Sequence, residues 1–324
     1  MVLGAGVLSG GESLGSPKRG DGRWAERRSV DRRETAGGAC GWVVAIVHPL
    51  RAGGPSLRTG STVPAGGWRA PFTKEVGRAP LPVGASLSVV WEGCFNVRDL
   101  GGIPVAGGGL IRAGAVVRAD NPERLTAAGW AAAVEHGIRT VVDLRNDNEH
   151  QRDLCERPAS ITTVRVPLDD AADTAFWAYL WENELDGSPL YYRVFLERKA
   201  PHCAAALTAI ARAEPGGVLV HCGLGRDRTG LIVMVLLALA GVAPDDIAAD
   251  YEVSVDRLPP LFAALGMEDQ ADEIRGILAR KKTTLRAALL GALDGLDVEN
   301  RLRAAGLGED DISVLRERLV LLDG

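Results

Sequence analysis

The chain has few cysteines, and none of them stands in a Cys-x-x-Cys pair. Its 324 residues include five cysteines, an odd number that runs from Cys40 to Cys222. This usage excludes a scaffold built on disulfides and offers no zinc-binding spacing. Unpaired thiols persist in a reducing compartment, so we expect a cytoplasmic protein.

Long apolar runs and aromatic residues are also scarce. The run Trp42 to Val47 is too short to cross a bilayer, residues 231–239 suit a buried helix, and Met1 is not followed by a signal-peptide pattern. We therefore expect no transmembrane segment. Aromatic residues make up 5% of the chain, which supplies no stacking platform for bases, so we expect no nucleic-acid partner.

The N-terminal part differs in composition from the rest. Residues 1–90 hold 17 of the 40 glycines and a formal charge of +6, whereas the remaining residues carry −11. Hydrophobic periodicity is weak before residue 86. We predict that residues 1–88 are a disordered Gly/Arg-rich leader, or sequence translated from a wrongly chosen start codon. A basic arm for nucleic acid or membrane lipid is the alternative. Because the remainder is acidic, an anionic substrate would need a local basic pocket.

Strand and helix patterns alternate from residue 95 onward. They predict strands at 95–102, 115–118, 140–145, 163–168 and 218–221, and helices at 125–136, about 190–212, after Thr229, at 245–251 and over most of 255–324. This order predicts an α/β fold with a central, mostly parallel sheet flanked by helices, and a helical C-terminal region. Sites in such sheets lie beyond the carboxyl ends of the strands. The pattern places these residues there: Cys222, Asp143, Arg145, Asp169 and Asp170.

The segment His221–Gly230, with the sequence HCGLGRDRTG, carries the strongest functional signal. It predicts the end of a buried strand, a tight loop and the start of a helix. Such a loop points backbone N–H groups and a helix N-terminus toward an anion, and it favours the thiolate form of a cysteine at its base. Cys222 is the one cysteine with an arginine, Arg228, six residues later. The segment predicts phosphate-ester hydrolysis through a phosphocysteine intermediate; the alternative is a buried structural cysteine.

The residue types in this segment indicate their roles. Cys222 would attack phosphorus, and the planar fork of Arg228 would hold two phosphate oxygens. Thr229 would either donate a hydrogen bond to the thiolate or cap the helix. Glycines would let the backbone approach the anion or adopt a positive φ angle. The predicted phosphate-binding residues are Gly223, Leu224, Gly225, Arg226 and Thr229.

The proton donor is less sharply defined by the sequence. We favour Asp227, which lies inside the loop, although it could instead form an ion pair with Arg226. The alternatives are Asp143, Asp169, Asp170 and Asp186. We expect His221 to order the loop by hydrogen bonding rather than to act as a base. Neither a metal nor a cofactor is predicted, because the arginine and the amides would stabilise the charge.

The loop sequence His-Cys-x-x-Gly-Arg-Asp-Arg-Thr-Gly resembles that of the bacterial tyrosine/serine protein phosphatases of the mycobacterial protein tyrosine phosphatase B type, within the cysteine-dependent phosphatases. Further similar segments are Asn96–Gly102, Val117–Asp120, Gly137–Arg145, Ala240–Val242, Ala249–Tyr251 and Leu302–Leu307. The resemblance implies a cysteine-phosphatase fold with the catalytic domain at 89–324 and a helical lid within 250–285. It implies Cys222 as nucleophile, Arg228 as phosphate clamp and Asp227 as acid. The family usually has lysine at the position of Arg226, a position linked to phosphoinositide recognition, and arginine changes the donor geometry there.

The expected activity is therefore that of a protein-tyrosine phosphatase, with dual specificity and phosphoinositides as further substrate classes. The partner would be a phosphorylated protein or a phosphoinositide. Two other functions stay open from the residues alone: a phosphate-binding module without turnover, and sulfur transfer through a persulfide on Cys222. Nothing in the sequence specifies an oligomeric state.

Overall fold

A six-stranded sheet forms the centre of the described part of the chain, residues 86–321 of the computed structural model. Its strand order is β1 (Leu87–Ser88), β2 (Arg98–Asp99), β4 (Val116–Ala119), β7 (Gly217–His221), β5 (Ile138–Asp143) and β6 (Thr162–Arg165). Strands β4, β7, β5 and β6 are parallel, whereas β1 and β2 add antiparallel pairs at one edge. The prediction of a mostly parallel sheet is confirmed. Nearly all of the predicted leader, 1–88, lies outside the described residues.

Helices make up most of the remaining structure. They are α1 (Ala127–Glu135), α2 (Thr174–Glu182), α3 (Tyr192–Arg198), α4 (Ala200–Ala211), α5 (Asp227–Leu239), α6 (Pro244–Leu265), α7 (Ala271–Arg280), α8 (Leu285–Leu293), α9 (Val298–Ala304) and α10 (Glu309–Leu319). Three short 3-10 helices are η1 (Pro122–Arg124), η2 (Asp147–Glu149) and η3 (Pro189–Tyr191), and β3 (Leu110–Ile111) pairs with β8 (Val320–Leu321). The predicted helical C-terminal region is confirmed.

The single helix predicted over 190–212 is wrong. Two helices, α3 and α4, occupy this range and meet at Lys199, whose φ of −128° departs from helical geometry. Pro201 stands in the first turn of α4, where its missing N–H costs no hydrogen bond. In one continuous helix Pro201 could not donate to the Glu197 carbonyl and its ring would clash with it, which explains the break.

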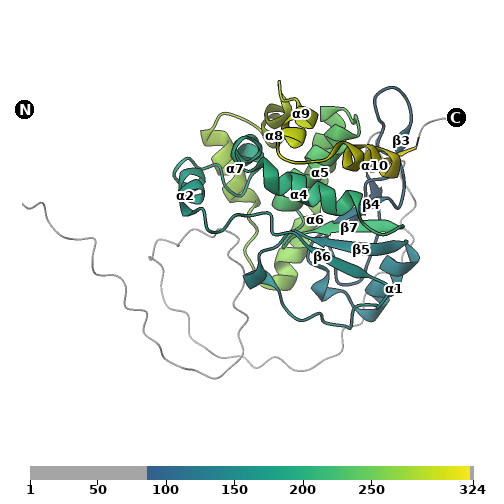
Figure 1. Cartoon of the computed structure of the whole chain (residues 1–324). Coiled ribbons are helices and arrows are strands. Elements are labelled where there is room, and N and C mark those ends of the chain that lie inside the picture. Colours follow the sequence, from purple (N-terminus) through teal and green to yellow (C-terminus); the bar gives the residue numbers. More distant parts are fainter. Residues whose placement is uncertain (1–85, 322–324) are drawn as a thin grey trace, which may run out of the picture. The chain divides into compact units, whose positions relative to one another are not determined.

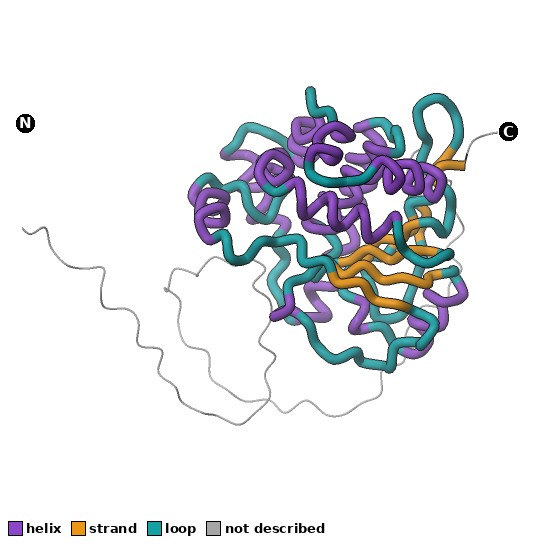
Figure 2. Tube along the Cα trace, viewed as in Figure 1, coloured by secondary structure: helices purple, strands orange, loops and turns teal. Residues whose placement is uncertain are grey.

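The sheet separates two hydrophobic cores. Side chains alternate along β7, so that Val218 and Val220 face the larger core with α4 and α5, while Leu219 faces the smaller one with Trp130 of α1. Figures 1 and 2 show this arrangement, with α4, α5 and α10 on one side of the strands and α1 on the other. The N-cap of α1 is Thr126, since its side chain accepts a hydrogen bond from the Gly129 N–H at 3.1 Å.

Helix α6 is much longer than the predicted helix at 245–251. It continues for 22 residues to a left-handed Gly266 cap, where φ is +65°, and contains Pro259 and Pro260. Its first half packs behind the loop that follows β7, through Asp250 and Ser254, which are fully buried. Its last residue, Leu265, reaches the other side of that loop.

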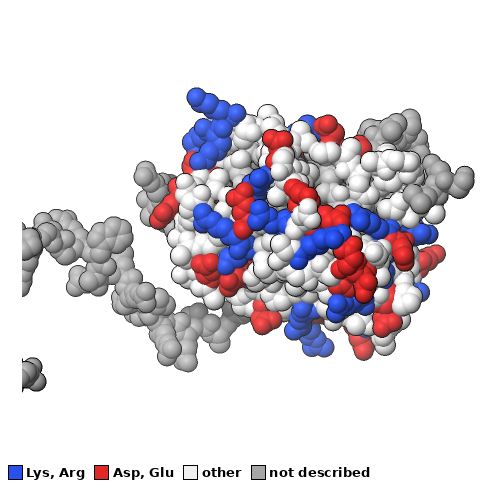
Figure 3. Space-filling view, turned by 45° about the horizontal axis from the view of Figure 1, so that its top comes forward, with Lys and Arg blue, Asp and Glu red and all other residues white. Residues whose placement is uncertain are grey.

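Side chains of both charge signs lie on the surface of the described part (Figure 3), and its cysteines are unpaired. On the face drawn in Figure 3, basic and acidic side chains are interspersed, without one large area of a single sign. The cysteines at 94, 155, 203 and 222 are free thiols. No helix among residues 86–321 has the length and apolar character needed to span a bilayer.

Candidate active site

Strand β7 brings Cys222 to the carboxyl edge of the sheet. All residues of β7 are buried, and the strand pairs with β4 on one side and β5 on the other. Cys222 follows immediately and is 3% exposed. Helix α5 begins at Asp227, so a loop of five residues, 222–226, connects the thiol to the N-terminus of a buried helix. This is the strand, loop and helix order that the sequence predicts.

The two loop glycines serve different purposes. Gly225 has a φ of +67°, and a Cβ built there would lie 2.3 Å from the backbone oxygen of Ala119 at the end of β4. Only glycine allows this approach of loop to strand. Gly223 has neither constraint, since a Cβ there would lie 3.9 Å from Arg228 Nη2 and meet nothing closer. The predicted positive φ therefore holds at Gly225, and the predicted approach of the Gly223 backbone to an anion stays a prediction.

Arg228 is fixed by carboxylates in front of the loop. Its Nη1 and Nη2 donate to Oε1 and Oε2 of Glu149 at 2.5 and 2.7 Å, and Nη1 lies 3.2 Å from Asp169 Oδ2. Burial alone would lower the pKa of Arg228, but Glu149 and Asp169 outweigh it and raise that pKa well above its ordinary value. The guanidinium is therefore permanently charged and held in a defined plane.

Asp169 differs electrostatically from Glu149. Burial raises the pKa of Asp169 above its ordinary value, with Arg228 acting in the opposite sense and Glu149 reinforcing the rise. Burial would also raise the pKa of Glu149, yet its hydrogen bonds with Arg228 prevail and lower it. Of the two carboxyl groups beside Arg228, Asp169 is thus the one that holds a proton more readily.

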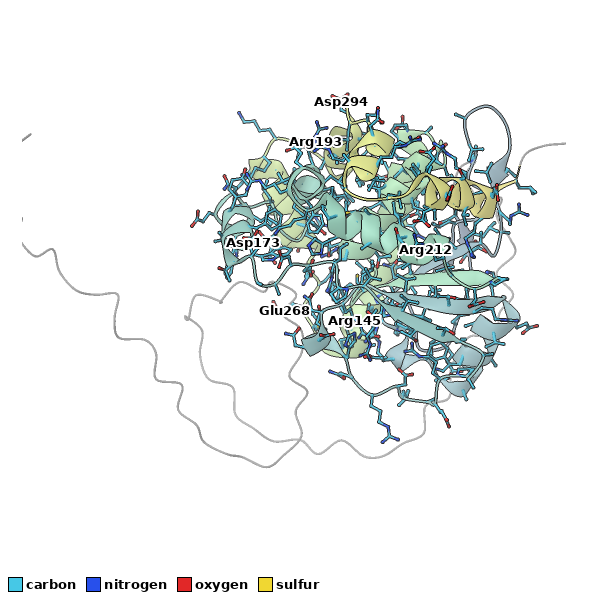
Figure 4. The ribbon with its side chains drawn as sticks, viewed as in Figure 1. Arg145, Asp173, Arg193, Arg212, Glu268 and Asp294 are labelled. Atoms are coloured by element: carbon cyan, nitrogen blue, oxygen red, sulfur yellow. The ribbon has the colours of Figure 1, made fainter. Side chains whose placement is uncertain are left out.

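A second ion-pair cluster, centred on Arg145, lies beside the loop. Arg145 Nη2 donates to Asp143 Oδ2 and to Glu123 Oε1, both at 2.7 Å. Burial opposes ionisation of Asp143, but Arg145 and its other neighbours hold the pKa of Asp143 well below its ordinary range. Figure 4 shows Arg145 beyond the end of β5, on the side of the sheet where Glu268 lies between α6 and α7. This arrangement makes Asp143 a fixed anion rather than a proton donor.

His221 orders the loop, as predicted. Its Nδ1 lies 3.1 Å from the Cys222 carbonyl oxygen, and its Nε2 lies 3.5 Å from Asp143 Oδ2. Burial lowers the pKa of His221 to about 4, with Asp143 opposing the change. The ring is therefore neutral near pH 7 and can donate to the carbonyl through Nδ1–H.

Asp227 forms the ion pair that the sequence left open. Arg226 Nε donates to Asp227 Oδ1 and Oδ2 at 3.1 and 3.2 Å, and Arg226 Nη2 donates to Gln270 Oε1 at 2.9 Å. The Tyr251 hydroxyl donates to Asp227 Oδ1 at 3.5 Å. Asp227 nevertheless lines the same hollow as Cys222 and Arg228, so the ion pair does not remove it from the site.

Thr229 does not cap helix α5. The helix begins two residues earlier, and its N-cap, Arg226, makes no capping side-chain bond. Within residues 86–321, the buried Thr229 hydroxyl has no hydrogen-bond partner. A buried hydroxyl without a partner is uncommon. Because this hydroxyl bonds to no acceptor of the described residues, Cys222 Sγ included, its donation to the thiolate stays a prediction.

Leu265 and Met267 cover the loop. A narrow cavity of about 60 Å³ lies over Cys222 and is lined by Asn121, Arg124, Arg145, Glu149, Cys222, Gly223, Leu224, Asp227, Arg228, Leu265 and Met267. The two apolar residues come from the end of α6 and the turn after it. This part of the chain falls within the range 250–285 in which the resemblance implies a helical lid.

The structure separates the other aspartates expected from the sequence. Asp169 and Asp186 line a second hollow with Asp227 and Arg228. Asp170 instead pairs with Lys199 Nζ at 2.8 Å, next to Asp173, which Figure 4 labels near α2. Glu149 was not predicted, because its local pattern with Asn146 indicates only a capping box and its contact with Arg228 spans 79 residues. In the described range, no cluster of three or more His, Cys, Asp or Glu side chains is arranged to hold a metal.

Comparison with known proteins assigns the family. Residues 89–321 match the tyrosine phosphatase family. The triple specificity protein phosphatase PtpB of Mycobacterium tuberculosis is 32% identical over 202 residues, which cover 53% of this chain and 71% of that protein. A tyrosine-protein phosphatase of Nostoc commune is 29% identical over 224 residues, covering 64% of this chain and 75% of the relative. The chain belongs to the tyrosine phosphatase family and is a phosphoric monoester hydrolase of the protein-tyrosine phosphatase type.

Proposed function

We propose that this phosphatase works through a phosphocysteine formed on Cys222. The thiolate attacks phosphorus, an S–P bond forms, and the P–O bond to the leaving group breaks as that oxygen takes a proton from the acid. Water then attacks phosphorus, the S–P bond breaks, and the acid recovers its proton while the thiolate returns. The observation that supports this cycle is the placement of Cys222, Arg228 and the N-terminus of α5 around one cavity.

Arg228 and the loop backbone would hold the phosphate. Glu149 contacts Nη1 and Nη2 of the guanidinium, and the Nε–H together with the second Nη2–H remains for two phosphate oxygens. The N–H groups of Gly223, Leu224 and Gly225 and the positive end of α5 would neutralise the rest of the charge. To donate to the Cys222 thiolate, the Thr229 hydroxyl, which has no partner among the described residues, would have to turn toward the sulfur.

The test of the nucleophile is a serine substitution with a matched control. Cys222→Ser should abolish hydrolysis of para-nitrophenyl phosphate and labelling of the denatured protein by a radioactive phosphate ester. Cys155→Ser, which also removes one free thiol, should leave both unchanged. If Cys222→Ser hydrolysed at the parent rate, the mechanism would be refuted. A parent protein that binds phosphate esters without turnover would instead be the binding module.

Asp227 is our proposed acid, with Asp169 as the second candidate because its raised pKa suits a proton donor. Asp227→Asn should slow hydrolysis of phenyl phosphate, whose leaving group needs the proton, far more than that of para-nitrophenyl phosphate. Asp169→Asn should slow both substrates alike if Asp169 acts only by holding Arg228. If Asp169→Asn, and not Asp227→Asn, slowed phenyl phosphate hydrolysis preferentially, Asp169 would be the acid.

We further propose that the enzyme accepts phosphotyrosine, phosphoserine and phosphothreonine, and phosphoinositides as a separate class. The name of the Mycobacterium tuberculosis relative, a triple specificity phosphatase, and the cationic Arg226 in the second hollow beside Asp227 and Arg228 support this breadth. Steady-state kinetics on the three phosphopeptide types and on a soluble phosphoinositide would test it. Activity confined to phosphotyrosine would refute the broader range.

We also propose that residues 89–324 suffice for catalysis and that the protein works in the cytoplasm. The family match over 89–321 supports the domain boundary, and the free thiols suit a reducing compartment. A chain starting at residue 86 should keep the kcat/KM of the whole protein. A large loss of kcat/KM would show that the leader takes part.

A further inference from the structure

The carbonyl groups of the catalytic loop are held from outside by three successive hydrogen bonds. The backbone N–H of Asn121 donates to the Gly223 oxygen at 3.0 Å. The Asn96 side-chain amide donates to the Leu224 oxygen at 3.0 Å, and Arg118 Nη2 donates to the Gly225 oxygen at 2.8 Å. Each donor comes from a segment about 100 residues or more earlier in the chain.

These bonds determine where the loop N–H groups point. The described peptide bonds are all trans, and in a trans peptide the N–H and C=O groups point in opposite directions. The peptides after Gly223, Leu224 and Gly225 therefore direct the N–H groups of residues 224, 225 and 226 away from the three outside donors. Within residues 86–321 none of these three N–H groups donates to another protein group.

Two of the three outside donors, Asn96 and Arg118, are themselves held in place by one buried carboxylate. Asp250 of α6 accepts from Arg118 Nη1 at 2.5 Å and from Arg98 Nε at 2.8 Å. Arg98 Nη1 donates to Asn96 Oδ1 at 2.7 Å, which orients the amide of Asn96 so that its NH₂ group faces the loop. Burial alone would raise the pKa of Asp250, but the two arginines outweigh it and hold that pKa well below its ordinary value. The network is therefore charged and completely buried.

We propose that Asn96 and Arg118 are positioning residues that turn the loop peptides so that their N–H groups bind the phosphate. The inference rests on the proposed phosphate-binding role of the loop. Loss of either donor frees a loop peptide to rotate. Its carbonyl oxygen, which is partly negative, would then face the anion in place of the partly positive N–H group. Because one preorganised N–H donor is worth about a hundredfold in rate at an oxyanion site, a single rotated peptide has a large effect.

Two pairs of variants in the full chain separate positioning from mere packing. Asn96→Ala removes a loop donor, whereas Ser254→Ala removes a hydroxyl of the same network that contacts Asn96 and Arg98 but not the loop. Arg118→Met removes the second loop donor, whereas Arg98→Met removes an equal charge from the same carboxylate and reaches the loop only through Asn96. Tungstate, an unreactive tetrahedral oxyanion, is titrated by calorimetry, and thermal unfolding is followed in parallel.

We expect Asn96→Ala and Arg118→Met to weaken tungstate binding by about tenfold or more. Ser254→Ala should bind as the parent does, and Arg98→Met should show a smaller loss than Arg118→Met at a comparable fall in Tm. Equal losses within each pair would overturn the positioning role. If an arginine variant does not fold, the neutral pair decides by itself. A parent that binds no tungstate would refute the phosphate-binding role of the loop, which is a different failure.

Discussion

Acidification should destabilise the fold through His221, which is fully buried next to Cys222. Burial lowers its pKa from 6.5 to about 4. Above pH 6.5 the ring is neutral in both states and contributes no pH dependence. Between pH 6.5 and 4 only the unfolded chain takes up the proton, so stability falls as the pH falls, by about 1.4 kcal/mol per pH unit. Over this window the total is about 3 kcal/mol, a large share of the stability of a typical domain.

Urea denaturation of the parent and of His221→Gln at a series of pH values measures this contribution. Other groups titrate in the same range, but they do so in both proteins, and the difference between the two curves isolates His221. The curves should run parallel above pH 7 and converge or cross as the pH falls toward 4, because the variant lacks the penalty. Curves that remain parallel throughout would refute the assignment of a buried, neutral imidazole.

Three further predictions concern the loop and its surroundings. Gly225→Ala should unfold the loop and abolish activity, because its Cβ would meet the Ala119 backbone at 2.3 Å. Gly223→Ala, the control, should keep most of the activity and a near-parental Tm. Equal effects of the two variants on kinetics and thermal unfolding would contradict this prediction. Glu149→Gln should lower kcat/KM about tenfold by loosening Arg228, and a rise in activity would show that Glu149 competes with the substrate. Met267→Ala should speed alkylation of Cys222 by iodoacetamide several-fold, because Met267 covers the cavity; an unchanged rate would show that access is set elsewhere.

Local sequence was sufficient to predict the catalytic loop. The strand, the glycine with positive φ and the presence of a helix after the loop depend on neighbouring residues, so HCGLGRDRTG specifies them directly. The parallel sheet could also be predicted, because alternation of buried strands with helices leaves few other arrangements. The same local logic failed at Thr229, since the helix begins two residues before the threonine and leaves no cap for it to form.

The contacts that surround the loop could not be predicted in this way. Glu149, Asn96 and Asp250 reach it from segments far apart in the chain, and nothing in their local sequence encodes those pairings. Helix α2 was also not anticipated. Its sequence TAFWAYLWE is rich in aromatic residues, which are weak helix formers, and its packing against the core supplies the stability that propensity does not.

Helix α6 carries both a residue that supports the catalytic loop from behind and a residue that lines the cavity over Cys222. Two prolines lie between these residues along the helix. Asp250 sits on the segment before the prolines and Leu265 on the segment after them. Pro259 and Pro260 lack the N–H groups that would bond to the carbonyls one turn earlier, so the helix resists bending least at this point. The short segment after the prolines, residues 261–265, can therefore bend relative to the loop without displacing the longer segment whose Asp250 anchors Arg118.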